Sequence, residues 1–274
     1  MEFKPAYPQH NDNVSHNSPF REFVVLLAGV ALICVVAFAV SGWLVDTVVQ
    51  SISPDMEARI FAPVAPGQAR SGDQVDAGEL ALQRMVDELG SCIDVGYPLK
   101  VELVASKAAN AMALPGGRII VLSGILNKVR SENGMAFVLA HELAHFKNRD
   151  HLSGLGRGIV LTAMMAFLTG SDSGLTRLFT PAVGLSAASY SQARESRADS
   201  LALKALVCRY GHAAGATEFF QAMKDEHRGG GISNYFASHP EAVERIGRLE
   251  ELSTAQGYAT GVARELPPSL KQAE

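Results

Sequence analysis

A long apolar run near the start of the chain limits what this protein can fold into more than any other feature. Residues 23–45 carry no charged side chain, and a helix of this length crosses the hydrocarbon core of a bilayer. Arg21 and Glu22 precede the run, Asp46 follows it, and Trp43 lies where an interfacial aromatic residue is favoured. The sequence therefore predicts one N-terminal transmembrane helix, through which the protein contacts the lipid bilayer.

Two alternative interpretations of this run stay open. Residues 37–39 have the small-x-small pattern of a signal-peptidase site, although the leader would be long, weakly basic and followed by further apolar residues. A buried helix of a soluble protein is the second alternative, and the lack of a polar face argues against it. Lys4 and Arg21 precede the run and the next basic residue is Arg59, so the positive-inside rule keeps the N-terminus in the cytoplasm. We favour a retained anchor, and both the retained and the cleaved form export the main domain.

The rest of the chain divides by composition. We expect a flexible tail over residues 1–22, a linker with Pro, Gly and Ser over residues 46–77, a folded domain over residues 78–252 and a loose C-terminal tail over residues 253–274. The net charge is only −4, and no basic cluster is interleaved with aromatic residues, so nucleic acid is not an expected partner.

Within the folded domain, the pattern predicts an α+β fold that is mainly helical. Residues 79–89 have apolar side chains at helical spacing, residues 99–106 alternate as in a strand, and residues 110–124 indicate two short strands around a Pro-Gly-Gly turn signal. Residues 158–168 are apolar on all sides but too short to span a bilayer. We expect a buried core helix there, with a membrane-dipping element as the alternative.

The spacing of the cysteines indicates no clear pattern of disulfides. Cys34, Cys92 and Cys208 are widely spaced and form no CxxC pair. Because free cysteine usually packs as a small hydrophobic residue, buried thiols are the favoured interpretation. Pairing of Cys92 with Cys208 in an oxidising compartment is the open alternative.

The segment "FVLAHELAHFKN" carries the strongest chemical signal. His141 and His145 are four positions apart, so they lie on the same face of a helix that Ser131 can cap. Two imidazoles one turn apart can share a zinc ion, and Glu142 projects beside the metal, where it can take a proton from an activated water. This HExxH pattern predicts one Zn²⁺ per chain.

Two candidates remain for the third protein ligand. His151 lies ten positions after His141, the metzincin spacing, although Asn148 stands where those enzymes have glycine. Glu195 is the other candidate, four positions before Asp199 on an apolar-periodic helix, where like charges destabilise. A metal gives each carboxylate a role, with Glu195 on the metal and Asp199 accepting a hydrogen bond from the second nitrogen of His141. The ordinary alternative is a solvated face of ion pairs with neighbouring arginines.

Four motifs together resemble a known family. "NAMALPGGRIIV", "VLAHELAH", "ESRAD" and "SHPEAVERI" look like the membrane-associated zinc metallopeptidases that include the CaaX prenyl proteases and the heat-shock protease HtpX. The resemblance covers most of the chain and implies a gluzincin-like domain, in which a small sheet with an edge strand is followed by helices around the metal. His141 and His145 match the ligand histidines and Glu142 the catalytic glutamate. The glutamate of ExxxD falls on Glu195, which makes it the third ligand and leaves His151 a structural role.

The motif "SHPEAVERI" implies a further site residue. By resemblance, His239 comes near the zinc, where it can stabilise the oxyanion of a tetrahedral intermediate or occupy the fourth metal position in a resting enzyme. The plainer interpretation of this motif is a helix start with Pro240 at the first position.

The resemblance also shapes the expected location and task. HtpX-like and CaaX-type members carry several membrane spans, whereas this chain has one convincing span. It looks more like the exported, single-anchor bacterial members, which implies an inner-membrane protein with a periplasmic catalytic domain that turns over damaged or misfolded envelope proteins. The alternatives are a catalytically silent zinc-fold binding protein or chaperone, and a multi-span intramembrane protease in which residues 158–168 enter the bilayer. The sequence leaves the oligomeric state open.

The expected substrate is an extended or unfolded polypeptide that adds a strand to an exposed edge of the sheet. Because strand addition reads the backbone, we expect broad specificity. The strand after the Pro-Gly-Gly turn is unusually apolar for an idle edge, and the predicted substrate-binding residues are Arg118, Ile119, Ile120 and Val121. The alternative is that these residues simply pack in the sheet.

Overall fold

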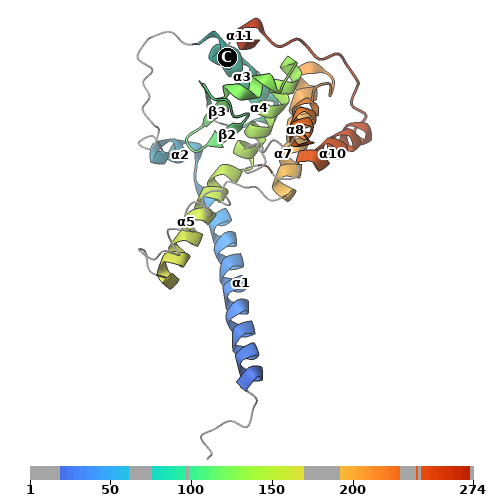
Figure 1. Cartoon of the computed structure of the whole chain (residues 1–274). Coiled ribbons are helices and arrows are strands. Elements are labelled where there is room, and N and C mark those ends of the chain that lie inside the picture. The colour runs from blue at the N-terminus through green and yellow to red at the C-terminus, as the bar shows by residue number, and fades with distance from the viewer. Residues whose placement is uncertain are drawn as a thin grey trace, which may run out of the picture. The chain divides into compact units, whose positions relative to one another are not determined.

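The computed structural model describes residues 19–61, 76–96, 99–169, 192–228, 239 and 242–271 (Figure 1). The chain forms two compact units, Met1–Leu44 and Val45–Glu274, and each is considered by itself.

The first unit contains most of one long helix, α1 (Pro19–Ser51). The side chains of residues 19–40 are exposed. Among the described helices, α1 is the one that is long and apolar enough to cross a membrane. The predicted N-terminal helix is therefore confirmed as a candidate membrane span, and it continues past residue 45 to Ser51.

The second unit is built on a three-stranded sheet of β1 (Lys100–Val104), β2 (Ala111–Leu114) and β3 (Arg118–Leu122). β3 pairs in parallel with β1 and antiparallel with β2, so the strand order is β1-β3-β2. The turn between β2 and β3 contains Gly116 and Gly117 at φ values of 86° and 77°, a left-handed backbone that glycine adopts without steric penalty.

This strand order corrects the predicted substrate edge. β3 is the central strand, so its backbone groups are paired on both sides, and the prediction that Arg118, Ile119, Ile120 and Val121 bind peptide is wrong. Ile119 and Val121 are fully buried, and Arg118 binds Glu102 of β1 at 2.9 and 2.8 Å. The edge strand beside the helix of the HExxH motif is β2, whose residues pack against that helix.

Helices pack against this sheet and supply most of the domain, in agreement with the predicted mainly helical α+β class. α4 lies at the centre: it is buried from Asn133 to Phe146 and packs against α7, α3 and β2 (Figure 1). A helix that is apolar on every side needs cover on every side. The bounds are α2 (Pro54–Phe61), α3 (Ala77–Ile93), the 3₁₀ turn η2 (Ser123–Asn127), α4 (Glu132–Lys147), α5 (Asp150–Thr169), α7 (Gln192–Tyr210), α8 (Glu218–Arg228), α10 (Ala242–Ala255) and α11 (Pro268–Lys271).

Two segments that the sequence predicts to be irregular are packed instead. α2 lies inside the predicted linker, and its Glu57 is completely buried. The C-terminal segment, predicted to be loose, returns across the domain: the backbone N–H of Glu132 donates to the carbonyl of Arg264 at 2.9 Å, and Leu266 and Leu270 are buried. Both segments are held by a few long-range contacts that leave no periodic signal in the sequence.

α5 departs from the expected buried core helix. Its first residues are buried, but Leu155 and Ile159 are exposed, as is Ala163. The expectation is therefore wrong for the part of residues 158–168 whose side chains are described. The helix is buried from Asp150 to Gly154 only, and its next turns expose Leu155 and Ile159.

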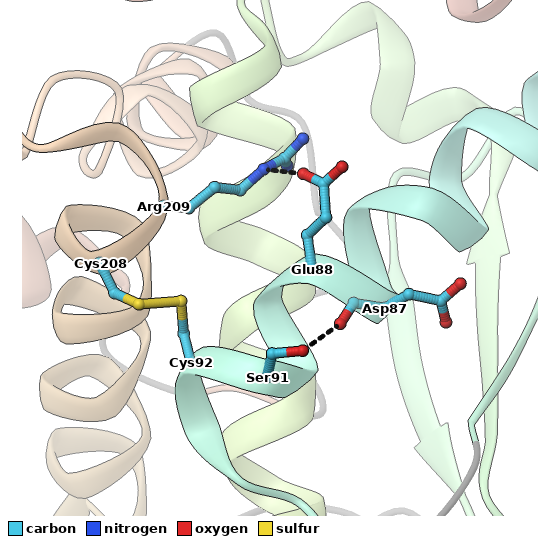
Figure 2. Close-up of a disulfide and its surroundings, with 6 residues drawn as sticks. All are labelled: Asp87, Glu88, Ser91, Cys92, Cys208 and Arg209. Carbon is cyan, nitrogen blue, oxygen red and sulfur yellow. Dashed lines mark hydrogen bonds and ion pairs between the residues drawn. A yellow bond between two sulfur atoms is a disulfide. The ribbon is translucent and has the colours of Figure 1, made fainter.

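A disulfide joins Cys92 in α3 to Cys208 in α7, with a Cα–Cα distance of 6.1 Å. The favoured interpretation of buried thiols is wrong for this pair, while Cys34 stays unpaired and exposed. Figure 2 shows that the neighbouring residues also connect these helices, because Arg209 forms an ion pair with Glu88 at 2.6 Å. The disulfide closes a sequence separation of 116 residues, and closing a loop of that size removes about 4–5 kcal/mol of unfolded-state entropy.

Candidate metal centre

The HExxH residues lie on α4, which is buried from Asn133 to Phe146. Ser131 caps α4, as expected, by accepting a hydrogen bond from the backbone N–H of Gly134 at 3.0 Å. His141, Glu142 and His145 follow near the other end of the helix, each at most 1% exposed. Polar groups removed from water this completely need partners.

The partners come from two further segments. Glu195 and Asp199 enter from the first turns of α7, and both are buried, at 1% and 4% exposure. His239, also 1% exposed, comes from the segment before α10. The solvated face of ion pairs considered as the alternative for α7 does not form, because neither carboxylate reaches the surface.

Four side chains converge on one point. Donor atoms of His141, His145, Glu195 and His239 all lie within 4.8 Å of one another. Nε2 of His141 is 3.1 Å from Nε2 of His145, 3.3 Å from Oε2 of Glu195 and 3.4 Å from Nδ1 of His239. Zinc holds nitrogen and oxygen ligands at about 2.0–2.2 Å, which places the corners of a tetrahedron about 3.4 Å apart. The spacing of these donors therefore fits a tetrahedral metal ion of that size.

The second nitrogen of each HExxH histidine is also held. Nδ1 of His141 lies 3.1 Å from Oδ1 of Asp199, the contact predicted from the sequence. Nδ1 of His145 lies 3.0 Å from Oδ2 of Asp150, at the start of α5. A carboxylate on Nδ1 fixes the ring orientation and leaves Nε2 to face the donor set. The sequence analysis missed Asp150, and its place five positions after His145, at the next helix start, was the available signal.

Arg245 of α10 is the second residue that the sequence analysis missed. It is completely buried and donates from Nη1 to Glu195 at 2.6 Å and from Nε to Asp199 at 2.8 Å. Its guanidinium lies 4.3 Å from the centre of the Phe220 ring. Two buried like charges on one helix require a cation, and the arginine within "SHPEAVERI" was the candidate.

The buried carboxylates of the site outnumber the arginines that contact them. Glu142, Asp150, Glu195 and Asp199 are four buried carboxylates. Arg245 contacts two of them and Arg194 contacts Asp150, so these two arginines leave two negative charges uncompensated. A divalent metal ion or protons on the histidines can balance them.

The pKa values follow from the same charges. Burial alone would raise the pKa of Glu195, but His141 and the other histidines hold it far below its usual range. Burial alone would lower the pKa of His145, but hydrogen bonds with Asp150 and Glu195 outweigh it and raise that pKa to about 9. The pKa of His239 is lowered, because burial outweighs its carboxylate neighbours. An ionised glutamate and a neutral His239 are suited to metal binding, whereas His145 has to release a proton before its Nε2 can bind a metal ion.

Glu142 faces the donor set with one oxygen and the sheet with the other. Oε2 accepts a hydrogen bond from the backbone N–H of Ala113, in β2, at 3.0 Å. Oε1 is buried and has no hydrogen-bond partner among the described residues, although Nε2 of His239 lies 3.6 Å away. An unpartnered carboxylate oxygen in a dry site is costly, and it indicates a place for a polar ligand.

His151 lies outside the donor set. Its Nε2 is 2.9 Å from Oε1 of Glu57, and its Nδ1 faces the carbonyl of His145 at 3.4 Å. The ring thus joins α2 to the end of α4 and does not return toward the HExxH histidines. The metzincin arrangement does not match this geometry.

Fold and site together define a gluzincin-type metallopeptidase: an HExxH helix beside a sheet edge, with a glutamate on a later helix completing the cluster. The chain belongs to Peptidase family M48, whose family model matches residues 77–253. It is 33% identical to a protease HtpX homolog of Burkholderia cenocepacia strain HI2424, and the match covers 62% of this chain and 73% of that relative. A protease HtpX homolog of Burkholderia multivorans is 32% identical over the same shares of the two chains. The protein is a metalloprotease, as the HExxH and ExxxD motifs predict.

Proposed function

We propose that this protein is a membrane-anchored zinc endopeptidase whose catalytic domain faces outward from the cytoplasm. One observation carries the proposal: a buried donor set lies beside a glutamate oxygen that has no hydrogen-bond partner among the described residues. His141, His145 and Glu195 would hold the zinc, and Asp199 and Asp150 orient the two histidines.

The reaction is hydrolysis of a peptide bond. Zinc bound by the three ligands would lower the pKa of a water molecule and polarise the scissile carbonyl. Glu142 takes the proton of the attacking water on Oε1 and returns it to the leaving amide nitrogen. The N–H of Ala113 holds Oε2 at 3.0 Å and so keeps Oε1 turned toward the reacting atoms.

His239 has two roles open to it. Its Nδ1 lies 3.4 Å from Nε2 of His141, where it supplies a fourth donor in a resting site. In the working enzyme, a neutral ring can donate a hydrogen bond to the oxyanion that develops on the carbonyl. The lowered pKa of His239 supports the neutral form that both roles require.

The substrate is held by β2 and not by β3. The backbone N–H of Leu122 donates to the carbonyl of Asn110, and antiparallel pairs alternate between bonded and non-bonded. The N–H and C=O groups of Ala111 and Ala113 therefore point away from β3. Their N–H groups already donate to Oδ1 of Asn110 and Oε2 of Glu142, at 2.9 and 3.0 Å. The carbonyl groups remain to accept hydrogen bonds from the backbone of an extended polypeptide, which favours unfolded chains of many sequences.

The Cys92–Cys208 disulfide supports an oxidising compartment for the domain, because structural disulfides are rare in the cytosol. In a bacterium with an inner membrane, this supports our proposal of a periplasmic domain on a single N-terminal span. A protease of broad specificity in that position is suited to removing damaged or misfolded envelope proteins.

Three variants of the full chain test the site. Glu142→Gln should keep stoichiometric zinc and lose about 100- to 10,000-fold in the cleavage of denatured casein, because the general base is removed. Glu195→Ala should lose zinc as measured by elemental analysis, whereas His151→Ala should retain it. Normal cleavage by Glu142→Gln, or full zinc in Glu195→Ala with none in His151→Ala, would contradict the assignment. Zinc binding by the wild type without any cleavage would support the silent binding protein instead.

A further inference from the structure

The exposed apolar side chains of the second unit are not scattered. Its described residues expose eight large apolar side chains, and five of them lie on the last turns of α1, on α2 and on α5. The other three lie elsewhere: Leu80 on α3, Val104 on β1 and Val262 in the segment between α10 and α11. We call the group of five the α2–α5 face: Val48, Met56, Ile60, Leu155 and Ile159.

α2 has the most unusual exposure of these elements. The helix buries Glu57 completely and leaves Met56 and Ile60 half exposed, at 50% and 51%. A helix on the surface of a water-soluble domain has the opposite arrangement, with apolar residues inward and charged residues outward. The outward side of α2 is therefore fitted to an apolar surrounding.

Polar contacts hold α2 in this orientation. Glu57 accepts hydrogen bonds from the backbone N–H of Gly116 at 2.9 Å and from Arg149 at 2.6 Å, and it contacts His151 at 2.9 Å. Arg149 also donates to the carbonyl of Ile52 at 2.6 Å. Because every polar contact of Glu57 points into the domain, the helix cannot turn its apolar side inward without leaving a buried carboxylate unpaired.

α5 is joined to the same corner of the domain. Arg157 forms an ion pair with Asp46 at 2.5 Å. The backbone at Gly156 comes so close to Val45 that an added Cβ would lie 2.7 Å from its Cγ1. The two contacts fix the orientation of α5, which leaves Leu155 and Ile159 exposed at 39% and 61%.

The connection between α1 and α2 indicates what covers this face. Residues 23–45 form the apolar run of the candidate membrane span, and Val48 follows it by three positions in the same helix. α2 begins three positions after α1 ends, so the α2–α5 face cannot lie far from where the chain leaves the bilayer. α2 also exposes the charged residues Asp55 and Arg59, which suit the headgroup level of an interfacial helix.

We propose that the α2–α5 face is a membrane-contacting surface that seats the catalytic domain on the lipid headgroup–acyl boundary. The partner is the bilayer leaflet on the side of the catalytic domain. An interfacial helix of this kind buries its apolar side about 5–10 Å into the boundary. The proposal does not depend on the zinc chemistry, because none of its residues belongs to the donor set.

Lipid quenching of single fluorescent labels tests this surface in the full chain. In a Cys34→Ser background, Ile60→Cys and Ile159→Cys are labelled and the protein is placed in phosphatidylcholine nanodiscs with brominated acyl chains. Leu80→Cys and Val262→Cys are matched controls, since both replace exposed apolar residues outside the face. Emission should fall at least twofold at positions 60 and 159 and stay unchanged at the controls. Bromines near the headgroups should quench more strongly than bromines near the chain ends.

Three results would overturn the proposal. Equal emission with and without bromine at positions 60 and 159 would show that lipid does not reach the face. Stronger quenching at position 159 by bromines near the chain ends would show an inserted segment, as in a multi-span protease. Energy transfer between donor- and acceptor-labelled copies at position 60, without bromine quenching, would assign the face to a second copy of the chain. Caseinolytic activity and thermal stability of each labelled protein establish that it is folded.

Discussion

At the scale of single residues, Arg245 is the clearest case of a charge that the site cannot lose. Its guanidinium contacts both Glu195 and Asp199 within the buried cluster. Removing one partner of a buried ion pair costs about 3–5 kcal/mol, because the remaining charge stays in a dry environment. Replacing both partners is a different matter, so the prediction applies to the single substitution.

Arg245→Met should therefore lower the thermal midpoint by about 6–20 °C, as a loss of this size does in a domain of this length. Arg197→Met is the matched control, since Arg197 lies on the exposed side of α7 and should shift the midpoint by less than about 2 °C. Scanning calorimetry of both variants with equal zinc content makes the comparison. Equal stability of the two variants would mean that the guanidinium of Arg245 adds nothing to the cluster.

At the scale of elements, α2 contributes stability that depends on pH. Burial alone would raise the pKa of Glu57, but the hydrogen bond and charge of His151, the N–H of Gly116 and Arg149 together lower it below its ordinary 4.5. A carboxyl group with a lowered folded-state pKa stabilises the fold above its ordinary pKa. This stability is lost as the pH falls through the lower, folded-state value.

Glu57→Gln should accordingly unfold at a lower temperature than the wild type at pH 7. The difference between the two should shrink as the pH falls below 4.5 and through the lower folded-state pKa, where the wild-type carboxyl becomes protonated as well. Thermal melts at several pH values between 3 and 8 measure it. A difference that stays constant over this range would show that shape, and not charge, is what Glu57 supplies.

The edge strand β2 predicts a pattern with period two in the substrate. Methylation of a backbone amide removes one donor, and in a paired strand only alternate amides face the neighbouring strand. In a model peptide of constant sequence, methylation at alternate positions should raise KM at least about tenfold, the loss of one or two hydrogen bonds. Methylation at the positions between them should leave KM nearly unchanged. An N-methyl scan with uniform effects, or with none, would remove β2 from the binding cleft.

At the scale of the whole molecule, the disulfide joins two parts of the core that are far apart in sequence. Cys92→Ser should lower the thermal midpoint by about 5–15 °C, from the 2–5 kcal/mol that a native disulfide usually contributes. Reduction of the wild type should give a similar shift, whereas Cys34→Ser should give none. In intact cells, an exported domain should resist thiol labelling at positions 92 and 208 until it is reduced. Free thiols at both positions would contradict the outward orientation.

Most residues of the site could be predicted from their spacing in the sequence, because His141, Glu142 and His145 share one helical turn, and Glu195 and Asp199 share another. The strand order could not be read in the same way: an apolar strand after a turn fits an edge or a centre equally well, and only the parallel pairing with β1 decides it. Arg245 and the disulfide depend on which distant segments meet in space. α2 was missed for a physical reason as well. It buries its glutamate and exposes its methionine, so it lacks the inward-facing apolar pattern by which a helix is predicted, and the sequence predicts part of a linker there.

The disulfide also sets an order of events. Cys208 is made long after Cys92, and the segment that contains Glu195 lies between them. In the exported orientation that we propose, Cys92 crosses the membrane first, and the disulfide can form only after Glu195 and then Cys208 have also crossed. The finished protease then comes into being only on the far side of the bilayer, so that during its own synthesis the proteins of the cytoplasm are never exposed to it.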